Sequence, residues 1–153
     1  MVDPRAKGAR TETQARDLLR KHTGLQWERV PGSGALDEKH GLKGDLYVPN
    51  EKNHYAVEVK GYAEDHISSA LLSSKSPQLL KFWEQATRQG TQVKKEPLLI
   101  FKFDRSKFFV AHNDPNYLPD GSYPYLYFDR DGQGAFIMLL EDWLVNEQPR
   151  FIS

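Results

Sequence analysis

The sequence predicts an α/β fold in which a single mixed central β-sheet is flanked by helices. The chain has 153 residues, the length of one domain with one sizeable core. Segments with strand periodicity alternate with segments of helical periodicity in the order α, β, β, β, α, β, β. We therefore expect one domain over residues 1–153, divided into a basic arm (1–10), a core (11–111) and an acidic C-terminal hairpin and helix (112–153).

The first elements follow from local patterns. Residues 1–10 are basic and have no hydrophobic period, which is typical of an arm. Thr11 and Gln14 form an N-capping signature before apolar residues at helical spacing, so a helix is expected over 12–22. Residues 25–30 alternate as a strand.

The next elements form a predicted antiparallel hairpin. Residues 45–48 and 55–60 alternate as strands, and a polar turn joins them. Residues 61–75 are polar and are expected to form a mobile crossover. Ser76 before Pro77 is typical of a helix start, and Gly90 is a plausible stop.

The remaining elements are a second pair of strands, a hairpin and a short helix. Their expected ranges are 97–103 and 107–111 for the strands, 123–128 and 135–140 for the hairpin, and 141–146 for the helix.

The composition excludes several classes of protein. There is no cysteine, which rules out a disulfide framework and a thiolate metal site. The longest apolar stretches are far too short to cross a bilayer, so we expect a cytoplasmic protein with no membrane partner. The neutral total charge hides an asymmetry, because residues 1–111 hold 19 basic and 14 acidic side chains and residues 112–153 hold 2 and 7. The basic first part is compatible with a polyanionic partner.

The hairpin holds the residues that point to chemistry. Glu58 and Lys60 lie on the same face of a strand, because side chains alternate along it. Asp45 opens the preceding strand and should meet Glu58. Asp37 competes for this role, but no strand follows it, so we favour Asp45. Two carboxylates that repel one another in this way are suited to a hard divalent cation.

Two further features sharpen this interpretation. Glu12 falls on the apolar stripe of the first helix, so its carboxylate should face the core side; an acid in a first turn is also favourable by itself. The segment 31–34 reads Pro-Gly-Ser-Gly, which is typical of a turn and is also suited to contacting a phosphate through its amides and hydroxyl. The sequence leaves both readings open.

Together these motifs resemble the archaeal-type Holliday junction resolvases of the PD-(D/E)XK nuclease superfamily. The resemblance covers about residues 6–111. It rests on residues that occur in the family's order, namely Lys7-Gly8, Glu12, the segment 27–34, Gly44-Asp45, the segment 57–60 and Gln78.

The resemblance implies a restriction-endonuclease-like fold and a homodimer that resolves four-way DNA junctions. It implies that Glu12, Asp45 and Glu58 hold magnesium, for which manganese can substitute, and that Lys60 orients or activates the attacking water. Ser33 and Gln78 would assist at the active site. Two rivals are another PD-(D/E)XK nuclease that cuts flaps, ends or specific sites, and a nucleic-acid-binding module without catalysis.

On a DNA substrate, we expect sequence-independent phosphate contacts from the basic residues of the first part. The expected DNA-binding residues are Arg5, Lys7, Arg10, Arg29, Gly32, Ser33 and Gly34.

Overall fold

The computed structural model describes residues 4–31 and 44–153. Its strands are β1 (Glu28–Arg29), β2 (Leu46–Tyr47), β3 (Tyr55–Tyr62), β4 (Glu96–Phe103), β5 (Phe109–His112), β6 (Leu126–Arg130) and β7 (Gln133–Leu139). Its helices are α1 (Pro4–Thr23), α2 (Ala70–Ser73), α3 (Gln78–Val93) and α4 (Leu140–Glu147).

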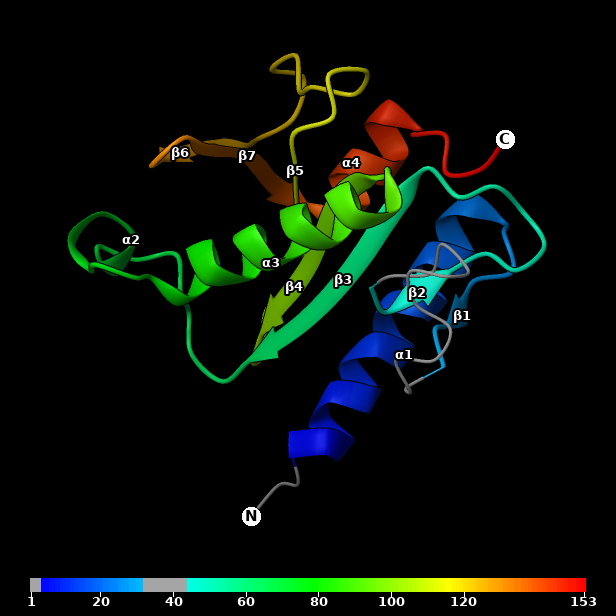
Figure 1. Ribbon diagram of the computed structural model, residues 1–153, viewed down its shortest axis with the longest axis horizontal. Helices are drawn as coiled ribbons and strands as arrows, with labels where there is room; N and C mark the ends of the chain where they lie inside the picture. The colour runs from blue at the N-terminus through cyan, green and yellow to red at the C-terminus, as the bar shows by residue number, and fades with distance from the viewer. Residues whose placement is uncertain (1–3, 32–43) are drawn as a thin grey trace.

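The described strands form one mixed sheet in the order β1-β2-β3-β4-β5-β7-β6 (Figure 1). β3 and β4 are parallel and pair over their full length, with α2 and α3 in the connection between them. The other neighbouring strands are antiparallel. This arrangement confirms the predicted mixed central sheet flanked by helices.

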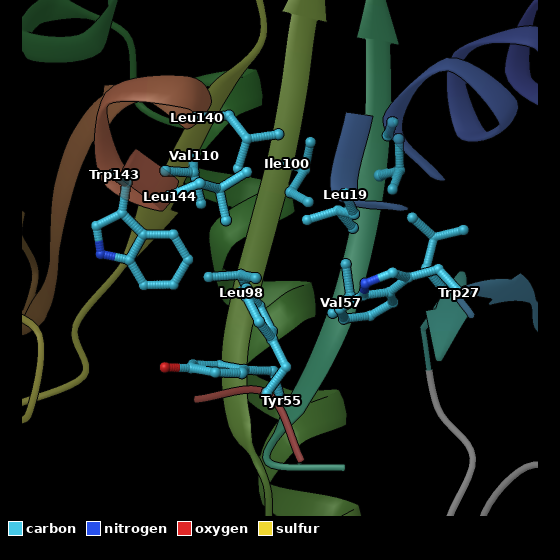
Figure 2. Close-up of a cluster of buried hydrophobic side chains, with 14 of the residues drawn as sticks. Leu19, Trp27, Tyr55, Val57, Leu98, Ile100, Val110, Leu140, Trp143 and Leu144 are labelled. Carbon is cyan, nitrogen blue, oxygen red and sulfur yellow. The ribbon is translucent and has the colours of Figure 1, made fainter. Parts of the chain in front are cut away.

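Each face of the sheet has its own apolar core. One core lies between the sheet and α1 and α4, and Figure 2 shows its side chains gathering over β3 and β4. Its largest buried members include Leu19, Trp27, Leu98, Leu140 and Trp143. The other core lies under α3, which buries Leu79, Trp83 and Ala86. β3 therefore lies in the middle of the molecule, with helices against both of its faces.

The N-terminal residues correct the prediction of a basic arm. Residues 4–10 form the first turns of α1, which begins at Pro4 rather than at residue 12. Proline suits the first helical position because its missing N–H would have no partner there, and Ala6 and Ala9 favour a helix. Thr11, the predicted cap, is instead a buried residue within the helix.

The end of α3 also differs from the prediction. The helix continues past Gly90 to Val93, and Lys94 then adopts the left-handed conformation that ends it. A Cβ atom on Gly90 would lie 2.7 Å from the Lys95 carbonyl oxygen. Glycine at this position therefore allows the chain to fold back closely against the helix, rather than terminating it.

The connection predicted as a mobile crossover contains the short helix α2. Its Leu71 is buried, and the Leu71 carbonyl accepts a 2.8 Å hydrogen bond from Arg130 Nη1. β1 is shorter than the predicted strand over 25–30, because Trp27 turns into the core and Leu25 packs against it. No helix within the described residues is long and apolar enough to span a membrane.

Candidate active site

Asp45 is fixed where β2 meets β3. Leu46 pairs with Val57 in antiparallel register, which places Asp45 beside the middle of β3. The Asp45 backbone N–H donates a 2.6 Å hydrogen bond to the Val57 carbonyl, and its Oδ2 accepts a 2.7 Å hydrogen bond from the Val59 N–H. Both bonds hold the carboxylate against the edge of β3.

The residue before Asp45 has to be glycine. Gly44 has a φ of +93°, a conformation that side chains disfavour. A Cβ atom on Gly44 would also overlap the Val57 carbonyl oxygen. The close approach that positions Asp45 therefore depends on Gly44.

Glu58 and Lys60 lie on the face of β3 that is turned towards α3. The Glu58 side chain is only 6% exposed, and the Lys60 Nζ lies 3.1 Å from its Oε1. The same ammonium lies 4.9 Å from the centre of the Phe82 ring, and Gln85 Nε2 approaches Glu58 Oε1 at 3.5 Å. The strand and α3 together hold Glu58 and Lys60 in a partly enclosed space.

Glu12 reaches this region from α1. Ala15 and Leu19 anchor α1 on the sheet with no exposed surface, and Glu12 lies on the same side, with its side chain 21% exposed. Its Oε2 accepts a 2.9 Å hydrogen bond from Arg29 Nε. The predicted inward-facing glutamate is therefore half-buried between α1 and β1.

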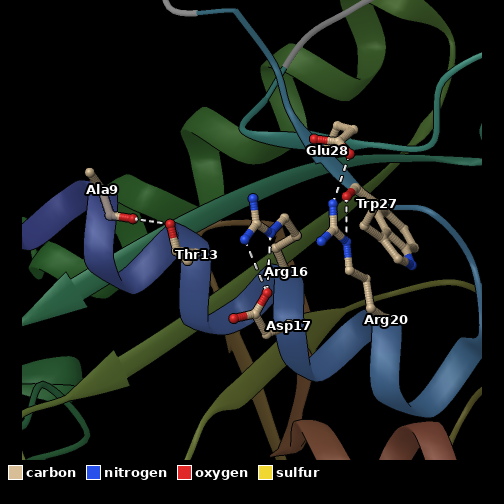
Figure 3. A network of polar contacts seen from close by, with 7 residues as sticks. All are labelled: Ala9, Thr13, Arg16, Asp17, Arg20, Trp27 and Glu28. Carbon is tan, nitrogen blue, oxygen red and sulfur yellow. Dashed lines mark hydrogen bonds and ion pairs between the residues drawn. The ribbon is translucent and has the colours of Figure 1, made fainter.

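Polar contacts along α1 fix the position of β1 (Figure 3). Arg20 Nε donates a 2.8 Å hydrogen bond to the Trp27 carbonyl, and its Nη2 donates one of 2.7 Å to Glu28 Oε1. These bonds hold β1 beside α1. Arg29 follows Glu28 in β1 and contacts Glu12, which lies closer to the start of α1 than Arg20 does.

The surroundings raise the pKa of both Asp45 and Glu58. Burial raises the pKa of Asp45 to about 8, with further contributions from repulsion by Glu58 and Glu12; the Val59 N–H acts in the opposite direction. Burial also raises the pKa of Glu58, although Lys60 counteracts it. Because each charge is held in the field of the others, the cluster stores unfavourable electrostatic energy at neutral pH.

This set of oxygen donors fits a hard divalent cation, which would relieve the repulsion. Two of the carboxylates also have cationic partners, since Glu58 contacts Lys60 and Glu12 contacts Arg29. In the part of the chain that the structure describes, no three His, Asp or Glu side chains are assembled as a ready-made metal site. Metal binding would therefore require these ion pairs to rearrange.

Comparisons with known proteins decide the family. The model of the family described as "Phage putative PDDEXK endonuclease" matches residues 3–120. The chain belongs to this family. Protein D14 of Escherichia phage T5 is 44% identical over 148 residues, which cover 94% of this chain and 92% of that protein. The structure of Hjc from Archaeoglobus fulgidus, a Holliday junction resolvase from an archaeal hyperthermophile, aligns with a TM-score of 0.44 and 18% identity over 90% of this chain and 93% of Hjc.

The family match confirms the predicted resemblance to the PD-(D/E)XK nucleases. In this PDDEXK endonuclease, Asp45 directly precedes β2, and the Glu58-x-Lys60 segment lies in the neighbouring strand β3, as the hairpin predicted. The structure brings Glu12 to the same place.

The glutamine that contacts the cluster is not the one that the sequence suggested. Gln78 lies exposed at the start of α3, and its role at the active site stays a prediction. Gln85, two turns further along, reaches Glu58. Helical spacing could have indicated Gln85, because Gln78 and Gln85 are seven residues apart and residues at this spacing lie on one side of a helix.

The predicted DNA-binding residues are only partly described. Arg10 is exposed on α1, and Arg29 is 45% exposed while it contacts Glu12. Arg5 and Lys7 belong to the first two turns of α1. The residues Gly32, Ser33, Gly34 and Asp37 lie outside the described ranges.

Proposed function

We propose that this chain is a magnesium-dependent, structure-selective DNA endonuclease that resolves four-way junctions as a homodimer. One observation carries the proposal: the buried Glu58 interacts electrostatically with the partly buried Asp45 and Glu12, and Lys60 Nζ lies 3.1 Å from Glu58 Oε1. Family membership supports the endonuclease class.

Each residue of the cluster has a part in phosphodiester hydrolysis. Asp45, Glu58 and Glu12 would hold the divalent ion, for which manganese can substitute. When bound, such an ion would supply charge stabilisation on the phosphoryl oxygens and an activated water. Lys60 is placed to orient the attacking water and to neutralise charge that develops on the phosphate. Its contact with Phe82 restricts the ammonium to this side of the strand.

The resemblance to the junction resolvases and the need for two cuts support the junction substrate and the homodimer. Resolving a four-way junction requires two symmetric cuts, and one chain carries a single set of Glu12, Asp45, Glu58 and Lys60. A twofold dimer would present two equivalent sites through one self-complementary surface.

Cleavage of matched substrates tests the proposal. The purified protein is incubated with four-way, flap and linear duplex DNA of shared sequence, in magnesium, manganese or EDTA. We expect cleavage of the four-way junction with either metal and no cleavage in EDTA. Preferential cleavage of flaps or linear ends would favour another PD-(D/E)XK nuclease activity. Binding without cleavage in any metal would leave a nucleic-acid-binding module.

Mixed dimers test the assembly. Wild type is mixed with Lys60→Ala, and cleavage of a supercoiled cruciform plasmid is followed. Mixed dimers should give nicked circles in place of linear product, because only one strand is cut per binding event. Linear product in constant proportion to the remaining wild type, together with a monomer in sedimentation on junction DNA, would contradict the dimer.

A further inference from the structure

A small cavity lies under the first half of α1, at the end of β3 and β4. Its volume is about 170 Å³, and it is lined by Arg10, Thr11 and Gln14 of α1, by Gly61 of β3, and by residues 102–104 at the end of β4 and just beyond it. Resting on the proposed nuclease function, we propose that this cavity binds a second phosphate of the DNA substrate, away from the bond that is cut.

The cavity and the active site lie at neighbouring residues of α1 and of β3. Thr11 directly precedes Glu12, and Gly61 directly follows Lys60. Side chains alternate along a strand, so Lys60 faces α3 whereas Gly61 faces α1. Glycine has no side chain, so the two sites are separated only by the backbone of β3. DNA that follows the end of this strand would meet both.

The wall between the two sites is closely packed. Thr11 is buried, and a Cβ atom added to Gly61 would lie 2.7 Å from its Oγ1. The absence of a side chain at Gly61 lets α1 pack directly on β3 at this point. The cavity floor therefore has a fixed position relative to Glu12 and Lys60.

The lining has the chemistry of an anion site. Arg10 comes from α1, and Lys102 comes from β4, where it pairs with Gly61 in the parallel register. Gln14 adds an amide, and Asp104 brings one negative charge, which leaves the lining net positive. Phosphates in protein–DNA complexes are bound by donors of these kinds.

The size of the cavity suits a phosphate. Its volume of about 170 Å³ has room for a tetrahedral anion. A DNA phosphate bound here belongs to a backbone that continues outside the cavity.

Salt-dependent binding tests this site without cleavage. The affinity of the full chain for a labelled four-way junction is measured in EDTA at several salt concentrations, for wild type, Arg10→Gln, Lys102→Gln and the double variant. Each contacted phosphate contributes about 0.9 to the slope of log affinity against log salt. Because both cations contact one phosphate, each single variant should flatten the slope, and the double variant should lose about 0.9 in total, rather than twice that amount.

Two variants serve as controls. Lys21→Gln removes an exposed lysine from the last turn of the same helix and should leave the slope unchanged. Lys102→Arg keeps the charge and should retain the wild-type slope. An unchanged slope in the double variant, or a loss in it of about 0.9 for each of the two residues, overturns the shared phosphate site.

Neutral linkages in the DNA locate the phosphate. A methylphosphonate is placed in turn at each position within a few nucleotides of the cut. One position should weaken wild-type binding and have no effect on the double variant Arg10→Gln/Lys102→Gln. If the junction is cleaved but no such position exists, the phosphate-site proposal is contradicted and the nuclease proposal stands. If the position exists but no metal supports cleavage, the nuclease proposal fails and the phosphate site stands.

Discussion

At the start of β3, the Tyr55 hydroxyl donates a 2.6 Å hydrogen bond to the buried carboxylate of Asp114, whereas three residues further along Glu58 meets carboxylates that repel it. Asp114 is 4% exposed, and its second oxygen accepts a 2.9 Å hydrogen bond from the Asn116 N–H. Glu58 is equally buried but faces Asp45 and Glu12.

The two clusters differ in how their buried charge is compensated. In the Asp114 cluster, donors are supplied by the protein itself, which is how buried polar groups normally remain stable. In the Glu58 cluster, the pKa of both Asp45 and Glu58 is raised, so compensation is incomplete. The comparison indicates that the protein itself compensates the buried charge at one end of β3, whereas the charge in its middle is left uncompensated, as the proposed cation site requires.

Neutralising Asp45 gives the largest expected effect. Asp45→Asn keeps an oxygen that can accept the Val59 N–H but removes a metal ligand, so we expect cleavage to fall on the order of 10³-fold. The free energy of unfolding of the metal-free protein should rise by about 1 kcal/mol, which raises Tm by about 3 °C. Initial rates and thermal melts in EDTA on the same sample measure both. Near-native cleavage by the variant would remove Asp45 from the site.

Acid should destabilise the other cluster through His112. This imidazole is fully buried against Trp143, and burial lowers its pKa to about 4, although Asp114 acts in the opposite direction. Its Nδ1 accepts the Asp114 N–H, and its Nε2 has no hydrogen-bond partner among the described residues.

The sign follows from proton linkage. Between pH 6.5 and 4 the unfolded chain binds a proton that folded His112 does not, so stability falls as pH falls, by up to about 3 kcal/mol. Urea unfolding of wild type and His112→Gln over this range measures the effect. The variant should lose less stability on acidification than wild type, and parallel curves would exclude His112 as the cause.

Removing the Tyr55 hydroxyl should lower the free energy of unfolding and leave cleavage unchanged, the opposite of the effects expected on neutralising Asp45. Tyr55→Phe leaves a buried carboxylate oxygen of Asp114 without its donor, which costs about 1–3 kcal/mol of unfolding free energy. Cleavage by the folded variant should be unchanged. Chemical denaturation and initial rates on Tyr55→Phe, with Asp114→Asn as the matched partner, measure this difference. A stability gain from Tyr55→Phe would erase the contrast between the two clusters.

The smallest expected effect separates two glutamines of α3. Gln85→Ala removes the donor 3.5 Å from Glu58 and should lower cleavage about tenfold, since it loses one long hydrogen bond to a charged group. Gln78→Ala on the same helix is the matched comparison. Initial rates at saturating DNA distinguish them. A larger loss from Gln78→Ala than from Gln85→Ala would restore the role that the sequence resemblance gave to Gln78.

The sequence by itself determined the features that depend on local periodicity. Alternation along one strand placed Glu58 beside Lys60, and the short turn between strands brought Asp45 to them. Helical phase placed Glu12 on the buried side of its helix. These relations hold because each involves residues of one element or of two elements joined by a short turn.

Only the tertiary structure decided the partners that come from distant segments. Gln85 reaches Glu58 across 27 residues, Arg29 reaches Glu12 across 17, and Tyr55 reaches Asp114 across 59. Gly61 is required by its close approach to the Thr11 side chain and Gly90 by its close approach to the Lys95 carbonyl, and no local pattern shows either contact. Separate helices pack against the two faces of β3, and this packing determines which side chains meet. The packing depends on the order of the strands in the sheet and on the face that each connecting helix covers, which no local pattern specifies.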